Sequence, residues 1–188
     1  VGYDDSLQPV PYDPDQARKL LEKAGVKAGT KIEMKAHPFW FAKGKEVMEY
    51  VAGALQEIGF EVDLQFLEPG AYTEARKSGS YDLALQQGGK PNNPCNQYKT
   101  FYINDTYGSG YGPQNPAFQE LVNQVCVEVD PTKADELYKQ IQKQIYDQSV
   151  EIQLYRQENI WAVRKRITGF EAYSPDTTRP WNGLGVSG

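Results

Sequence analysis

Residues 47–66 read VMEYVAGALQEIGFEVDLQF, and this stretch changes from helical to strand periodicity in its middle. Apolar residues at helical spacing line one face of its first part, namely Val47, Met48, Val51, Leu55 and Ile58. Gly59 is suited to ending that helix. From Phe60 to Phe66 apolar and polar residues alternate, which is typical of a strand. The stretch therefore predicts a helix followed directly by a strand.

The segments on either side extend this alternation. Before it, residues 31–36 (KIEMKA) alternate apolar and charged side chains and predict a half-buried strand. After it, a short helix over about 71–77 leads to a third strand over 81–86. Strand, helix, strand, helix, strand favours right-handed crossovers. The predicted fold class is therefore α/β, a mainly parallel sheet flanked by helices.

Three helix starts share one chemistry, an acid or amide side chain before a proline: Asp13-Pro14, Asn115-Pro116 and Asp130-Pro131. Gly25 is placed to end the first helix in a left-handed conformation. The other two predicted helices span 116–129 and about 131–148. Their expected inward residues are Phe118, Leu121, Val122 and Val125 in one, and Ala134, Leu137, Ile141 and Ile145 in the other.

The last part of the chain predicts two or three closing strands and a tail. Apolar residues suggest strands around 152–154, 160–162 and 167–170. Residues 174–188 are irregular and rich in Gly and Pro, with no core of their own. Trp181 in this tail is expected to pack on another part of the molecule or on a part that is missing.

Composition and charge exclude several classes of protein. The 188 residues are 39% hydrophobic and 24% charged, which predicts a globular domain and not a disordered chain. A net charge of −5 argues against a nucleic-acid partner. No apolar run reaches the length of a membrane span, and no signal peptide opens the chain. The start at Val1 suggests a processed product or a piece of something longer.

Motifs for catalysis or metal binding are absent. The sequence lacks a G-x-S-x-G elbow, a P-loop and HExxH, so we expect neither an enzyme nor a bound cofactor. Cys95 and Cys126 form no CxxC pair, and His37 is the only histidine, which argues against zinc. The two cysteines could form a disulfide in an oxidising compartment or remain free thiols. His37 is expected to be a surface loop residue, with a ligand contact as the alternative.

A polar loop after the third predicted strand is the candidate ligand site. In open α/β sheets ligands collect beyond the carboxyl ends of the strands. The loop offers amide groups, glycines that permit close approach and one cation: Gln86, Gln87, Gly88, Gly89, Lys90, Asn92 and Asn93. Lys90 could pair with a carboxylate. The same residue types also suit a surface turn, so both interpretations stay open.

Aromatic residues extend this candidate site. Tyr98 belongs to a series of aromatics that follows the loop, and side chains with polar tips suit ligand walls. Trp40, in the loop after the first predicted strand, is a second aromatic candidate. Glu68 and Tyr72, beyond the second predicted strand, are weaker candidates. Core or interface packing is an equal alternative for Tyr98 and the favoured interpretation for Trp40.

Several phrases carry a family resemblance: PYDPDQARKLLEKAG (11–25), LQEIGFEV (55–62), SYDL (80–83), NPAF (115–118) and the closing sequence 151–170. In this order they resemble the family 5 solute-binding proteins, the peptide and nickel receptors of ABC importers. The resemblance implies one lobe of a type II (cluster C) periplasmic-binding-protein fold. Residues 1–173 would form the carboxy-terminal lobe, and 174–188 an irregular tail that returns toward the amino-terminal lobe.

The resemblance also implies a function and a setting. Such a receptor closes on a peptide or similar small solute between its two lobes and delivers it to a membrane permease driven by ATPase subunits. It would act in the periplasm or outside the cell, often with a lipid anchor. Peptide-binding members carry an acidic residue near the ligand's amino group, whereas this chain has Lys90. That departure favours an anionic or neutral ligand, or a different pose.

Two other classes of function compete with the receptor. A small α/β hydrolase or transferase with a site at the same strand ends would need a nucleophile or a metal set. A stand-alone interaction module would bind a partner without recognising a small molecule.

Overall fold

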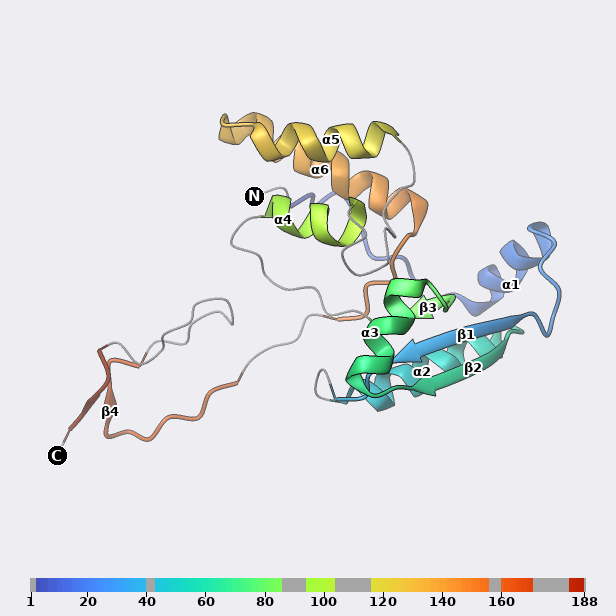
Figure 1. The fold of residues 1–188 in the computed structure, drawn as a ribbon, viewed down its shortest axis with the longest axis horizontal. Coiled ribbons are helices and arrows are strands. Elements are labelled where there is room, and N and C mark those ends of the chain that lie inside the picture. The colour runs from blue at the N-terminus through green and yellow to red at the C-terminus, as the bar shows by residue number, and fades with distance from the viewer. Residues whose placement is uncertain are drawn as a thin grey trace.

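The computed structural model describes residues 3–39, 43–85, 94–103, 116–155, 160–170 and 183–187. Figure 1 shows an α/β layer, a group of helices beside it and a carboxy-terminal segment that extends away from both. The elements in chain order are α1 (Pro14–Lys23), β1 (Lys31–Ala36), α2 (Gly44–Glu57), β2 (Glu61–Phe66), α3 (Pro69–Ser78), β3 (Leu83–Ala84), α4 (Pro94–Tyr98), the π-helix η1 (Lys99–Ile103), α5 (Pro116–Val127), α6 (Pro131–Gln148), β4 (Ile167–Thr168) and β5 (Gly185–Val186).

The α/β layer is built on a three-stranded sheet in the order β2-β1-β3. Both strand pairs are parallel, and β1 pairs with β2 from Lys31–Glu61 to Ala36–Phe66. Helices α2 and α3 cover opposite faces of the sheet (Figure 1). The predicted α/β class, the parallel pairing and the flanking helices are confirmed.

The core of this layer lies between α2 and the sheet. Its buried residues are Met34, Ala36, Met48, Ala52 and Leu85. Helical spacing in α2 and alternation in β1 bring these apolar side chains to one interface. Gly59 follows α2 with φ +110°, a left-handed conformation that glycine adopts without cost.

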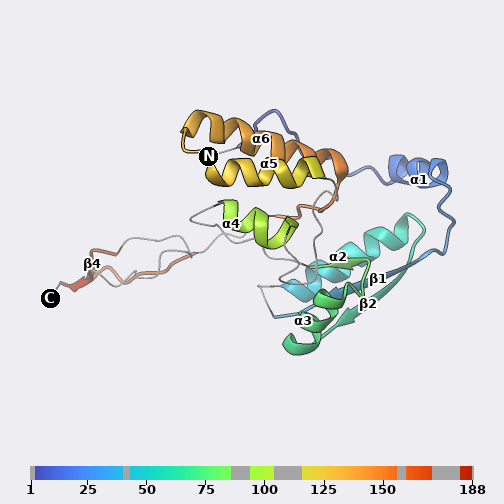
Figure 2. The ribbon, with the colours of Figure 1, turned by 45° about the horizontal axis from the view of Figure 1, so that its top comes forward.

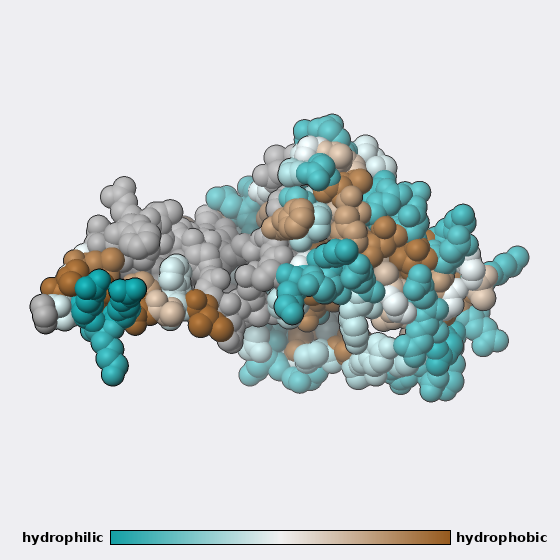
Figure 3. Space-filling model, turned by 90° about the horizontal axis from the view of Figure 1, so that it is seen from below, coloured by the Kyte–Doolittle hydropathy of each residue, from teal (hydrophilic) through white to brown (hydrophobic). Residues whose placement is uncertain are grey.

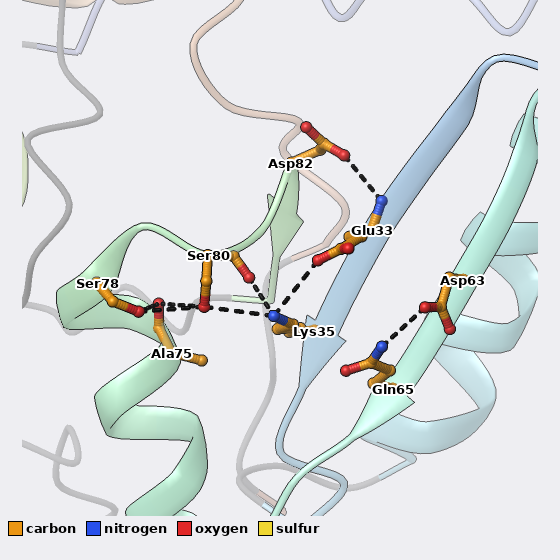
Figure 4. Close-up of polar contacts among 8 residues, drawn as sticks. All are labelled: Glu33, Lys35, Asp63, Gln65, Ala75, Ser78, Ser80 and Asp82. Atoms are coloured by element: carbon orange, nitrogen blue, oxygen red, sulfur yellow. Dashed lines mark hydrogen bonds and ion pairs between the residues drawn. The ribbon is translucent and has the colours of Figure 1, made fainter.

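Lys35 departs from the predicted alternation, because it is only 9% exposed. Its Nζ donates to the Ser80 carbonyl oxygen, lies 3.3 Å from Ser80 Oγ and is 3.5 Å from Glu33 Oε2 (Figure 4). As the middle strand of a parallel sheet, β1 has both faces covered by crossover helices. Alternation along such a strand therefore does not report which side chains reach solvent.

β3 is shorter than the predicted strand 81–86. The Glu33 amide donates to the Asp82 carboxylate at 2.8 Å, so a side chain takes the place of a strand carbonyl (Figure 4). The ladder bond from the Leu85 amide to the Lys35 carbonyl remains, at 3.2 Å. The carboxyl end of β3 therefore stays attached to β1.

The second core belongs to the helices α4, η1, α5 and α6. Its buried residues are Tyr102, Phe118, Leu121, Val122, Val125, Tyr138, Ile141 and Ile145, with Ala134 and Leu137 packed against them. Every inward position that the helical spacing predicted belongs to this cluster. Figure 2 shows α4 between the α5–α6 pair and the α/β layer.

The predicted helix starts and the first helix end are confirmed where the structure describes them. Asp13 accepts a hydrogen bond from the Gln16 amide at 2.8 Å, and Asp130 accepts from the amides of Thr132 and Lys133. α5 begins at Pro116 as predicted, while Asn115 lies outside the described residues. Gly25 follows α1 with φ +73°. A side-chain cap followed by proline therefore located the helix starts reliably.

The two cysteines form a disulfide between α4 and α5, with Cα atoms 5.3 Å apart. Of the two alternatives that the sequence left open, the structure has the bonded one. The bond ties the short helix α4 to the helical core beside it.

The predicted strands around 152–154 and 160–162 are wrong, since no strand lies there. Instead β4 pairs antiparallel with β5, which lies inside the predicted irregular tail. A strand needs a partner edge, and within the described ranges none lies beside these segments. Their apolar side chains are consequently exposed, Ile160 to 92%. Figure 3 shows apolar side chains at the surface of the extended carboxy-terminal segment. Trp181 falls outside the described residues.

Candidate functional site

The carboxyl ends of the three parallel strands meet at one edge of the sheet, at Ala36, Phe66 and Ala84. The Leu67 amide donates to the Ala36 carbonyl at 2.9 Å, which holds the chain after β2 against the end of β1. The chain leaving β3 enters the predicted ligand loop here. Ligands of α/β proteins bind at this edge, so the side chains that hold the residues next to the predicted loop matter for a ligand site.

Most of the predicted site residues lie outside the described residues. These are Gln86, Gln87, Gly88, Gly89, Lys90, Asn92, Asn93 and Trp40. Their ligand role stays a prediction. What the structure does describe is the residue on each side of the loop, together with the side chains that hold those flanking residues.

Tyr72 on α3 holds the residue before the loop. Its side chain is completely buried, and its hydroxyl donates to the Leu85 carbonyl oxygen. Burial raises the pKa of Tyr72 to about 12, so the hydroxyl keeps its proton at neutral pH and acts as a donor. Tyr72 thus supports the strand end, and its weaker candidacy as a ligand contact stays a prediction.

Arg76 lies on α3, and Glu68 lies just before this helix. The Arg76 guanidinium carbon is 5.9 Å from the centre of the Tyr72 ring, and Arg76 is buried as well. It stands one helical turn after Tyr72, so both side chains lie on the same face of α3. Glu68, the other weaker candidate, directly precedes α3 and is exposed. Of these residues, Glu68 is the one that solvent can reach.

His37 follows β1 and is buried, with only 8% exposed. Its ring meets the Phe39 ring edge-on at a centroid distance of 6.0 Å. The predicted surface position of His37 is therefore wrong. It directly follows Ala36, the last residue of the central strand β1, which is itself completely buried.

Tyr98, the one described residue of the predicted site, lies in the helical core. Its ring stacks on Tyr138 at a centroid distance of 5.8 Å and tilts against Tyr102 at 5.6 Å. Burial raises the pKa of Tyr98 to about 12, with smaller contributions from Tyr138 and Glu151. Packing of the ring on α6 accounts for these contacts. A ligand role for Tyr98 stays a prediction.

Cys95 holds the chain after the loop. It is buried, and its disulfide to Cys126 joins it to α5. A hydrogen bond between the Tyr138 hydroxyl and the Cys95 backbone, which lowers the pKa of Tyr138 against the larger effect of burial, joins it to α6. The predicted loop is therefore preceded by Leu85, which is bonded to Tyr72 of α3, and is followed, after Pro94, by Cys95, which is joined to α5 and α6.

Sequence reasoning missed Tyr138, and it named Tyr72 only as a weaker ligand candidate and Cys126 only as a possible disulfide partner. Tyr72 and Tyr138 occupy ordinary helical positions, and no local pattern distinguishes them from core tyrosines. Cys95 gave the one usable signal, because it follows the polar loop directly and has a possible partner on a predicted helix.

Other features of the described chain do not point to a different site. Within the described residues, no three acidic, histidine or cysteine side chains gather closely enough to hold a metal ion. An open hollow lies at the turn between α5 and α6, away from the strand ends, and is lined by Gln124, Val127, Glu128, Lys133, Glu136, Leu137 and Gln140. No helix in the described ranges is both long and apolar enough to cross a bilayer.

Comparison with known proteins places the chain among solute-binding proteins. The family described as "Bacterial extracellular solute-binding proteins, family 5 Middle" matches residues 1–109. A dipeptide-binding protein of Escherichia coli is 26% identical over 176 residues, covering 90% of this chain and 33% of the relative. A di/tripeptide-binding protein of Pseudomonas aeruginosa is 32% identical over 153 residues, covering 78% of this chain and 28% of the relative.

A solved structure shows the same fold. The periplasmic binding protein DppA from Helicobacter pylori, in complex with the peptide STSA, superposes with a TM-score of 0.70 at 22% identity. The match covers 79% of this chain and 30% of that protein. The chain thus spans about a third of the length of the curated relatives that it matches.

Proposed function

Because the chain belongs to the bacterial extracellular solute-binding proteins of family 5, we propose that it is the carboxy-terminal lobe of a receptor for short peptides. The receptor serves an ABC importer and catalyses no reaction. It captures its solute in a cleft between two lobes and releases it to the permease, which ATPase subunits drive. It works in the periplasm or outside the cell, and a lipid anchor is one way to keep it at the membrane.

One observation carries this proposal, the framed loop at the carboxyl edge of the sheet. Leu85 and Cys95 are both held by buried contacts, and Leu85 stands at the carboxyl edge of the sheet, where α/β proteins bind ligands. The peptide-binding relatives support a peptide as the solute. Since the chain spans about a third of those relatives, the other lobe supplies the rest of the site.

Within this lobe we assign the ligand contacts to the loop and two aromatics. The amide side chains of Gln86, Gln87, Asn92 and Asn93 donate to and accept from peptide groups, and Gly88 and Gly89 admit the ligand backbone. Tyr98 and Trp40 form the aromatic wall. Lys90 pairs with a carboxylate of the ligand, because an ammonium group repels the amino terminus of a peptide.

The competing function, a small α/β hydrolase or transferase, has less support. The family match is to receptors, and the relatives that resemble the chain over most of its length carry names of binding proteins. Turnover of a peptide by the chain would favour the enzyme over the receptor.

The experiment is a binding measurement on the full-length receptor. Native mass spectrometry identifies any peptide that co-purifies, and thermal unfolding with added L-alanyl-L-alanine measures stabilisation by a short peptide. The same dipeptide with an amidated carboxyl terminus should stabilise less, because Lys90 loses its partner. Lys90→Ala should remove that difference, whereas the matched control Lys77→Ala, an exposed α3 lysine, should keep it. Equal stabilisation by acid and amide in the unmodified receptor would contradict the role of Lys90.

A further inference from the structure

We propose that residues 151–155 and 160–163, the joining segments, are the surface on which the rest of the full-length receptor binds this chain. The inference rests on the proposed function in one respect, that the chain is one lobe of a longer receptor. It goes further by naming the surface through which the two parts join. The partner is the remainder of the same polypeptide, which supplies an open strand edge with apolar side chains beside it.

The joining segments expose large apolar side chains to solvent. These are Ile152, Leu154, Tyr155, Ile160, Trp161 and Val163. Figures 1 and 3 show that this part of the chain runs away from the two cores, with apolar groups at its surface. A segment that only spans solvent is typically polar, whereas clustered exposed apolar groups mark a surface that another body covers.

The backbone of the joining segments is open as well. In the described part of the chain, no hydrogen bond between backbone groups involves residues 151–155 or 160–163. The apolar side chains of Ile152 and Leu154 nevertheless alternate with the polar ones of Glu151 and Gln153, which is the pattern of a strand. Open backbone amides and carbonyls in such a segment are a template to which a further strand can be added.

Structured residues flank the joining segments on both sides. The Tyr102 hydroxyl donates to the Glu151 carboxylate at 2.8 Å, and Val150 packs against the helical core. After the second segment, β4 pairs with β5, and the Trp161 ring tilts against Phe170 at a centroid distance of 5.8 Å. The joining segments are therefore held at both ends and left open between them.

The length of the relatives identifies the partner. The match to the dipeptide-binding protein of Escherichia coli covers 90% of this chain but 33% of the relative. Most of a receptor of that length thus lies outside this chain and needs a surface on which to meet it. The joining segments combine exposed apolar groups with an open backbone, which suits strand addition from that part.

The first test compares hydrogen–deuterium exchange in the isolated 188-residue chain and in the full-length receptor. Amides in the joining segments should exchange at least about tenfold more slowly in the receptor, because added strands protect them. β1, which is paired on both edges, should exchange alike in the two proteins. Equal exchange of the joining segments in both proteins overturns the proposal. Protection in the isolated chain together with a dimeric mass would assign the surface to a second copy, and overturns it too.

The second test places a charge in the proposed joint. Ile160→Asp should lower the thermal unfolding midpoint of the full-length receptor by about 3 °C or more and leave the isolated chain unchanged, because only the receptor buries the carboxylate. The matched control is Val129→Asp, since Val129 is 94% exposed and Ile160 is 92% exposed in this chain. The control should change neither protein. An unchanged receptor midpoint with Ile160→Asp contradicts the proposal, and the exchange comparison decides the question without either variant.

Thermal stabilisation by L-alanyl-L-alanine separates this inference from the proposed function. A receptor that the dipeptide stabilises, but whose joining segments exchange as fast as in the isolated chain, keeps the proposed function and overturns the joining surface. A receptor whose joining segments exchange slowly, but which no short peptide stabilises, supports the joining surface and overturns the proposed function.

Discussion

The Lys35 ammonium group lies 3.3 Å from the Ser80 hydroxyl oxygen, although 45 residues separate the two along the chain. It also donates to the Ser80 carbonyl, and Ser80 lies between the end of α3 and the start of β3. Lys35 therefore ties the central strand β1 to the crossover that leads into β3. Because β3 has only two residues, this tie is one of the few contacts that hold the chain beside β1 at this point.

Replacing Lys35 with Met should destabilise the chain by about 1–3 kcal/mol, because the part-buried bond from its ammonium group to the Ser80 carbonyl is lost. Urea unfolding followed by circular dichroism measures the change. The control is Lys31→Met on the same strand, whose ion pair with Glu61 is exposed and contributes about 0–1 kcal/mol. Equal unfolding midpoints for the two variants would show that the Ser80 contact does not stabilise the fold.

Removing the disulfide should lower the free energy of unfolding by about 3–4 kcal/mol, since the bond closes a loop with a sequence separation of 31. The comparison is Cys95→Ala/Cys126→Ala against the oxidised chain in urea. Reduced unmodified chain should match the double variant closely. A loss below about 1 kcal/mol would mean that contacts such as Tyr98 with Tyr138 already hold α4 without the bond.

Alkaline pH should destabilise the chain through Tyr72 and Tyr98. Both pKa values are raised to about 12 in the folded state against the ordinary tyrosine value of 10.0, so the folded chain keeps protons that the unfolded chain releases. This stabilisation is fully present below pH 10 and is lost as the pH rises to 12. Each tyrosine accounts for a loss of unfolding free energy on the order of 2 kcal/mol over this rise in pH.

The measurement is the unfolding free energy of the chain between pH 9 and 12, with absorbance at 295 nm following tyrosine ionisation. Tyr98→Phe should flatten the decline, whereas Tyr50→Phe, which changes an exposed tyrosine, should leave it as steep. A decline of the same slope in Tyr98→Phe would place the alkaline sensitivity elsewhere.

Asp130→Ala should cost about 1 kcal/mol, because the amides of Thr132 and Lys133 lose their shared acceptor at the start of α6. Asp130→Asn keeps a side-chain oxygen in the same place and serves as the matched variant. The thermal unfolding midpoint should be lower for Asp130→Ala than for Asp130→Asn. An Asn variant as unstable as the Ala variant would indicate that the negative charge, and not the cap geometry, stabilises this helix start.

Local chemistry predicted the fold well wherever one side chain decides one conformation. The cap at Asp130, the glycines after α1 and α2 and the helical spacing of α5 each act over a few residues, so the sequence reports them directly. The strands predicted around 152–154 and 160–162 fail for the opposite reason. Strand formation depends on a partner that local sequence does not specify.

The candidate site shows the same difference between features set by local sequence and features set by distant partners. Composition identified the polar loop, because glycines and amides are readable one residue at a time. The residues that frame it, Tyr72 and Tyr138, could not be read in this way. Their roles depend on a carbonyl 13 residues away in one case and on the Cys95 backbone in the other.

The bond between Cys95 and Cys126 makes the intervening chain a covalent ring. A protease that cuts once inside this ring leaves two fragments still joined, so the cut chain keeps its mass on a non-reducing gel and separates only after reduction. For the same reason, an insertion or deletion between the cysteines changes the size of the ring but not the attachment of α4 to α5. Length variation between the cysteines is therefore compatible with the framework only outside α4, η1 and α5, whose side chains pack in the helical core.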